Sequence, residues 1–204
     1  MLDYLIVAEG PSEVGSTWED DRNGFLGELL PRCLKRLEID ANLECVPLRR
    51  IKQHGKGLAG KVRGAVARAE AEGKDGLLLF ADRDRDSQRP RDLEEGRKRA
   101  RLDSLAIRCA LGCPKETLEA WVLGDGSSLR GILPSANVHP NPESLNGKPG
   151  TARHPKTVFQ GLLGATPARD VFERAGRAHD LDTLAMSCQS FKAFLDDLNA
   201  EFGG

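Results

Sequence analysis

The sequence predicts an α/β fold, with a mainly parallel central sheet flanked by helices and a C-terminal helical extension. Two short apolar runs, at residues 4–8 and 76–81, end in turn or charged residues, which is typical of buried parallel strands. Segments with apolar residues at helical spacing separate the strand-like runs, and this alternation indicates βαβ units. After Asp125 the composition changes and helical segments follow.

The part of the chain before Asp125 carries the alternation of strands and helices. We expect strands at residues 4–8, 43–48, 76–81 and 105–111, and helices at residues 23–37, 58–72, 92–100 and 115–123. The first of these helices has its apolar residues on one stripe, and Pro31 within that stripe can kink it or divide it into two helices.

The remainder of the chain is predicted to form a loop followed by helices. Residues 134–155 are rich in Pro, Asn, Gly and His, which predicts a long loop. Helices are expected at residues 158–163, 168–175 and 191–202. We therefore divide the chain into an α/β core, residues 1–125, and a loop and helical extension packed on it, residues 126–204.

Length and composition fit an ordinary globular protein. A chain of 204 residues is long enough for one well-buried domain. No apolar run approaches the length of a membrane span, and no basic segment precedes the first strand as in a signal peptide. We expect a cytoplasmic protein that does not associate with membranes. The sequence leaves monomer and homodimer open.

The five cysteines are scattered, and their number is odd. Cys109 and Cys113 are four residues apart, but no second pair or suitably spaced histidine completes a zinc site. We expect reduced, partly buried thiols. The four histidines are isolated as well, and their spacing assigns none of them a role.

Acidic residues follow two of the expected strands. Glu9 and Glu13 come after the first strand, and Asp82 and Asp84 come after the third. Ligands of open α/β sheets bind just beyond the carboxyl ends of the strands, so these side chains converge if the two strands are neighbours. Crowded carboxylates repel one another unless a hard cation lies between them, and oxygen ligands suit Mg²⁺ or Mn²⁺. The pattern predicts metal-dependent phosphate chemistry.

Other interpretations of the aspartate segment are weaker. An EF-hand loop is excluded because Ser87 stands at its glycine position and Leu93 at its glutamate position. A phosphatase with a nucleophilic aspartate would usually carry the motif after its first strand. A charged turn that caps the next helix remains the alternative without function.

A third acidic cluster contains Glu116, Glu119 and Asp125. On a helix, Glu116 and Glu119 share a face, so both can be ordinary surface residues. Together with the other two clusters, however, one of these carboxylates can complete a metal site.

The segment from Arg49 to Arg68 is basic and contains no acidic residue, as expected of a surface that contacts a phosphate backbone or of a solvated face. Within it, residues 55–61 nearly match a phosphate-binding loop, but Val62 replaces the hydroxyl residue that holds Mg²⁺. A nucleotide-binding protein is therefore a third-ranked interpretation. Lys56 and Lys61 can still contact a phosphate.

The order of the motifs resembles the Toprim domain, which topoisomerases, bacterial primases, small recombination proteins and overcoming-lysogenization-defect nucleases share. Glu9 with Gly10 matches the glutamate motif of that family, and Asp82 with Asp84 matches its Asp-x-Asp motif. Three later segments look like a Toprim-related family of bacterial proteins that are often encoded beside an ATPase in phage-defence cassettes: residues 119–125, 154–156 and 190–195.

The resemblance implies roles for these residues. Asp82 and Asp84 would bind Mg²⁺, Glu9 would be a ligand or a general acid/base, and Glu13 and Glu119 would be further ligands. Arg83 and Arg85 interleave the acids, and they can contact phosphate or neutralise the cluster.

The function expected from the resemblance is a metal-dependent endonuclease acting on DNA or RNA. It would be an effector of phage defence under the control of a partner ATPase, because the chain has no convincing ATPase motif of its own. The rival expectation is a non-catalytic Toprim-like module that docks on an ATPase or on nucleic acid.

Overall fold

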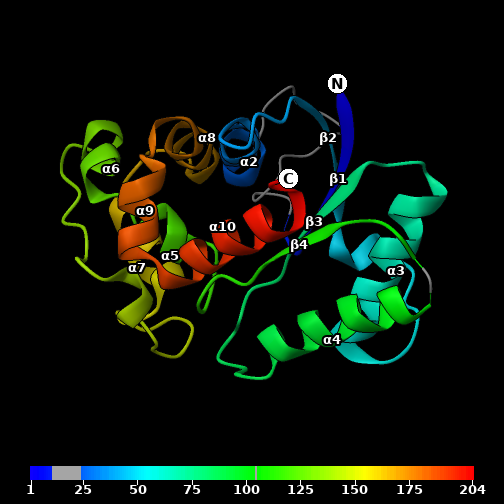
Figure 1. Cartoon of the computed structure of the whole chain (residues 1–204). Helices are drawn as coiled ribbons and strands as arrows, with labels where there is room; N and C mark the ends of the chain where they lie inside the picture. Colours follow the sequence, from blue (N-terminus) through cyan, green and yellow to red (C-terminus); the bar gives the residue numbers. More distant parts are fainter. Residues whose placement is uncertain (11–23, 104) are drawn as a thin grey trace.

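The computed structural model describes residues 1–10, 24–103 and 105–204 (Figure 1). In this part of the chain four parallel strands form one sheet, in the order β2-β1-β3-β4. Their bounds are Leu2–Ala8 for β1, Ala41–Pro47 for β2, Gly76–Phe80 for β3 and Cys109–Gly112 for β4. The predicted α/β fold with a parallel sheet and C-terminal helices is confirmed.

Both faces of the sheet are covered. In β1, Tyr4, Ile6 and Ala8 belong to one apolar core, whereas Leu5 and Val7 belong to another on the opposite face. Successive side chains of a strand point to opposite faces, so a central strand that is buried on both sides must be apolar throughout. The apolar runs seen in the sequence follow from this burial.

Helices form the two outer layers. The helices α2 (Phe25–Lys35) and α10 (Gln189–Phe202) contribute to the core on the face of Ile6. The helices α3 (Gly57–Ala71) and α4 (Arg89–Leu102) contribute to the core on the other face. The result is an α/β/α sandwich (Figure 1).

The direction in which successive strands are placed across the sheet reverses after β2, on either side of β1. From β1 the chain passes through α2 to the edge strand β2, and it then returns past β1 through α3 to β3. Because α2 and α3 lie on opposite faces, the gap between the carboxyl ends of β1 and β3 is the switch point of the sheet. Ligands of open α/β sheets bind at such a point.

The C-terminal part of the chain is helical and shares the core of α2. Its helix α8 packs on α2, and α10 packs on the edge strand β4. The remaining helices there are α5 (Glu119–Val122), α6 (Gly126–Ile132), α7 (Pro155–Leu163), α8 (Ala168–Ala178) and α9 (Leu181–Ser187). No helix in the described ranges is long and apolar enough to cross a membrane.

Several expected elements differ from the observed ones. The helices α6 and α9 were not predicted, because each has only seven residues and begins at an aspartate cap, Asp125 or Asp180. The helix expected at residues 115–123 is reduced to α5, and the fourth strand begins at Cys109. The helix α2 continues through Pro31 undivided. Residues 134–155 form the predicted loop, apart from a short 3₁₀ turn at Pro142–Ser144.

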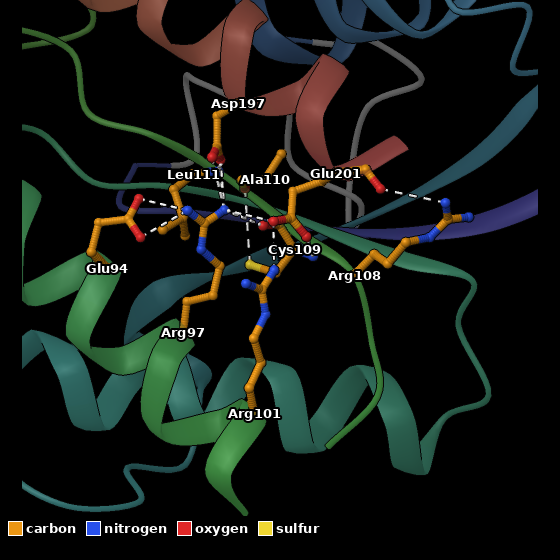
Figure 2. A network of polar contacts seen from close by, with 9 residues as sticks. All are labelled: Glu94, Arg97, Arg101, Arg108, Cys109, Ala110, Leu111, Asp197 and Glu201. Carbon is orange, nitrogen blue, oxygen red and sulfur yellow. Dashed lines mark hydrogen bonds and ion pairs between the residues drawn. The ribbon is translucent and has the colours of Figure 1, made fainter. Parts of the chain in front are cut away.

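Polar side chains cover the outer edge of β4 (Figure 2). The backbone N–H of Leu111 donates to Asp197 of α10 at 2.8 Å, and that of Cys109 donates to Glu201 at 3.4 Å. The guanidinium of Arg97, on α4, donates to the Cys109 carbonyl at 2.9 Å and to Asp197 at 2.8 Å. An edge strand left open can pair with another chain, and this network closes it.

Candidate active site at the carboxyl end of the sheet

The structure brings Glu9 and the aspartate turn together. In the pairing of β1 with β3, Val7 lies opposite Leu79, so Glu9 and Asp82 follow neighbouring strands at nearly the same level. The Arg89 guanidinium connects them. It donates to both carboxylate oxygens of Glu9, at 2.8 and 3.3 Å, to the Asp84 carboxylate at 3.0 Å, and to the backbone carbonyl of Asp82.

Arg89 is a residue of the site that the sequence did not single out. Burial alone would lower its pKa, but the hydrogen bond to Glu9 and the charges of Glu9, Asp84 and Asp82 raise it. Its guanidinium therefore stays charged and partly neutralises the carboxylates around it. The only signal in the sequence was its place in an arginine-rich stretch at the start of a helix.

Two turns with unusual backbone angles form the floor of the site. Asp84 and Arg85 have positive φ angles of 47° and 62°, and Glu116 has a φ of 64°. The two turns are joined by backbone hydrogen bonds, from Asp84 N–H to the Glu116 carbonyl at 2.9 Å and from Arg83 N–H to the Pro114 carbonyl at 3.0 Å. Non-glycine residues in this region cost free energy and gather at functional sites.

A cavity of about 390 Å³ opens beside these turns. The carboxylate residues Asp82, Asp84 and Glu119 line it, together with Lys156 and the backbone of the Glu9 segment at Gly10. The other lining residues are Thr117, Leu118, Pro149, His154 and Phe172. Residues of two acidic clusters, Asp82 and Asp84 of one and Glu119 of the other, therefore line one cavity, and Gly10 brings the end of the Glu9 segment to its wall.

Two side chains of this cavity have buried polar atoms without a partner among the described residues. His154 is 4% exposed and its Nδ1 has no hydrogen-bond partner, and Thr117 is 6% exposed and its Oγ1 has none. Buried polar atoms are usually paired in native proteins, so these two atoms are exceptions beside the cavity. His154 is the N-cap of α7, and Lys156 is the second residue of that helix.

The donor set has the chemistry that a hard divalent cation requires. Asp82, Asp84 and Glu119 offer carboxylate oxygens to the cavity, and Glu9 lies next to it. In the described part of the chain, no three His, Cys, Asp or Glu side chains are already arranged as a metal site. The Arg89 guanidinium bridges Glu9 and Asp84 in this arrangement, so it is the group with which a cation would compete.

The structure separates the other predicted site residues from this cavity. Glu13 lies outside the described residues. Arg85 is exposed, and Arg83 lines a different cavity. Lys56 is exposed at the start of α3, and the Lys61 ammonium donates to the Ile51 carbonyl at 2.6 Å. Neither lysine lines the carboxylate cavity.

Two glycines of α3 have a packing role, Gly60 in the segment that resembles a phosphate-binding loop and Gly64 beyond it. A Cβ atom at Gly60 would lie 2.6 Å from the Gly55 backbone, and one at Gly64 would lie 1.8 Å from the Lys52 carbonyl oxygen. The loop folds closely onto α3, and this contact alone requires glycine at both positions. The likeness to a phosphate-binding loop therefore has a structural explanation.

Two weaker ligand candidates of the third cluster do not line the cavity. Asp125 caps α6 through the N–H groups of Ser127 and Ser128, and it also accepts from the N–H of Asp180 at 2.8 Å. Glu116 is buried in the turn below Asp84, and its Oε2 has no partner among the described residues. Glu119 is the residue of this cluster that reaches the cavity.

Comparison with known proteins gives one family. A search of curated proteins found no match, and a search of solved structures found none either. The model of the family described as domain of unknown function DUF4276 matches residues 22–199, a range that includes the aspartate turn, Glu119 and His154 but not Glu9. The chain therefore belongs to the DUF4276 family.

Proposed function

We propose that this protein is a metal-dependent nuclease with a Toprim-like active site, which hydrolyses phosphodiester bonds in DNA or RNA. The observation that supports this most strongly is that Asp82, Asp84 and Glu119 line one cavity at the carboxyl end of the sheet, with Glu9 joined to Asp84 through Arg89. The positive φ angles of Asp84, Arg85 and Glu116 at the same place add to it.

Each group around the cavity has a task in this reaction. Asp82, Asp84 and Glu119 would hold Mg²⁺ or Mn²⁺, which when bound stabilises negative charge on the phosphate and activates water. Lys156, which lines the cavity, would bind the phosphate oxygens. The Glu9 carboxylate, oriented by Arg89, would serve as a further ligand or would accept the proton of the attacking water.

The biological setting of the proposal comes from the resemblance of the motifs to Toprim-related proteins. On that basis the nuclease is an effector of phage defence, and a partner ATPase controls it.

Cleavage assays with purified protein test the proposal. We expect the protein to nick supercoiled plasmid or to cleave single-stranded RNA with Mg²⁺ or Mn²⁺ and not with EDTA. Asp82→Asn and Glu9→Gln should each slow cleavage by at least about a hundredfold, because the lost carboxylates act on the developing charge. Asp40→Asn, at an exposed position before β2, is the control. Undiminished cleavage by Asp82→Asn, or no cleavage even with the co-encoded ATPase, would refute the proposal.

A non-catalytic docking module is the second candidate, and the position of Arg89 favours it. A guanidinium that already bridges Glu9 and Asp84 can make the metal unnecessary.

Calorimetric titration with Mn²⁺ separates the two functions. If the protein is a nuclease, the wild type should bind Mn²⁺, and the Arg89→Gln variant should bind it at least as tightly because the competing cation is gone. If Arg89 is instead the permanent counter-ion of a docking module, the wild type should bind no Mn²⁺. In that case Arg89→Gln should lower the free energy of unfolding more than Arg91→Gln, a substitution at an exposed neighbour.

A further inference from the structure

A second cavity lies on the other side of the aspartate turn. Its volume is about 490 Å³, which falls within the range of roughly 300–1,000 Å³ that is usual for small-molecule sites. Arg83, the residue between Asp82 and Asp84, lines it, so the two cavities share one turn. The other walls come from the start of α4, from β4 and the segment after it, from the loop at Glu143, and from the start of α10.

The walls combine apolar surface with cations. Leu93, Leu111 and Phe194 give the cavity an apolar side. Arg83 and Lys115 give it two positive charges, and neither side chain forms an ion pair with a described residue. The Nε of Arg83 is buried and has no hydrogen-bond partner in the described structure.

The acidic residues of the cavity are already engaged. Glu94 and Asp197 both pair with Arg97, at 2.6 and 2.8 Å (Figure 2). Glu143 accepts from the N–H of Ser190 at 3.0 Å and from its hydroxyl. Arg83 and Lys115 are the cations of this cavity that pair with no described carboxylate, so they are the groups that can bind an anionic ligand.

We propose that this cavity binds one nucleotide, with the phosphate on Arg83 and Lys115 and the base against the apolar side. Arginine and lysine are the usual phosphate ligands, and an aromatic base suits a wall of leucine and phenylalanine side chains. The exposed Gln189 amide at the rim offers both a donor and an acceptor to a base edge. The nucleotide is either the one next to the cleaved bond or a free mononucleotide, and only the first source rests on the proposed nuclease function.

Binding measurements on an inactive background test this. In Asp82→Asn protein we expect AMP to bind by calorimetry, or a fluorescein-labelled single-stranded oligonucleotide to bind by anisotropy in Ca²⁺. Ala193→Trp fills the cavity from an exposed position of α10, and Lys115→Ala removes one cation. Each variant should weaken binding at least about tenfold. Lys115→Ala removes a charge-assisted contact to the phosphate, and Ala193→Trp removes the space for the base. Ala200→Trp on the same helix and Lys35→Ala on α2, both at exposed positions, are the controls.

The outcomes separate the two sources of the nucleotide. Loss of AMP binding in both cavity variants assigns the cavity to a free nucleotide. Loss of oligonucleotide affinity alone assigns it to the nucleotide beside the cleaved bond. Binding by the cavity variants equal to that of their controls for both probes overturns the inference, even if the wild-type protein cleaves nucleic acid. Cavity-dependent binding without any cleavage supports the inference while refuting the nuclease.

Discussion

At the scale of single residues, the candidate site depends on how charges are balanced. The Arg89 guanidinium is the group that allows Glu9 and Asp84 to lie close together, since two unneutralised carboxylates would repel each other. In the neighbouring cavity Glu94 and Asp197 pair with Arg97, whereas the cations Arg83 and Lys115 pair with no described carboxylate.

His179 allows a prediction at this scale about stability and pH. Its ring is fully buried, and its Nε2–H donates to the Val122 carbonyl at 2.8 Å. Burial lowers its pKa from the usual 6.5, against the smaller opposing effects of the Val122 bond and the Asp125 charge. Below about pH 6.5 the unfolded chain therefore binds a proton that the folded protein resists, and the free energy of unfolding falls as the pH drops.

Urea unfolding between pH 7.5 and 5.5 checks this prediction. The wild-type midpoint should fall toward acid, and His179→Gln should show a flatter dependence because glutamine does not titrate. His139→Gln, at an exposed histidine, should keep the wild-type slope. A slope that is the same in all three proteins would show that His179 does not carry the effect.

At the scale of elements, the edge strand β4 is held by charged side chains of two helices. Arg97 is only 9% exposed, and it joins Glu94 of α4 to Asp197 and Glu201 of α10 (Figure 2). These charges keep the pKa of Arg97 above its usual value, although burial acts against it. The same two helices line the second cavity, so this network also sets its width.

Removal of the Arg97 side chain should therefore lower the free energy of unfolding substantially. Arg97→Ala leaves Asp197 and Glu201 without their common partner at the strand edge, and we expect it to lower the free energy of unfolding by about 3–5 kcal/mol. Arg99→Ala, two residues along the same helix, breaks only an exposed pair with Glu95 and should cost roughly 0.5 kcal/mol. Denaturant titration of both variants gives the comparison. Equal losses would mean that the network does not secure the edge.

The elements also show which parts of the fold the sequence can predict. The strands were predictable because burial on both faces demands continuous apolar runs. The helices α6 and α9 were not, because seven residues give too little periodicity and their ends depend on caps. Because α6 was not predicted, Asp125 was grouped with the acidic ligand candidates and not recognised as the cap of that helix. Its partner, the N–H of Asp180, is 55 residues away in the sequence.

At the scale of the whole molecule, the candidate site is made by both halves of the chain. The sequence predicted that Glu9, Asp82, Asp84 and Glu119 would share a site, because the carboxyl ends of parallel strands lie at one edge of a sheet. Residues 154–156 were noted only through the resemblance, and the spacing of the histidines did not place His154 at this cavity, because it follows the irregular loop of residues 134–155. No repeating pattern encodes the path of such a loop.

A crystal soaked in Mn²⁺ tests the central claim most directly, because it reports on metal and geometry together. We predict an anomalous peak in the cavity at about 2.1 Å from carboxylate oxygens of Asp82 and Asp84, with Glu9 or Glu119 completing the site. The peak should disappear in Asp82→Asn crystals. A Mn²⁺ peak only elsewhere on the molecule, with Arg89 still bridging Glu9 and Asp84, would contradict the account.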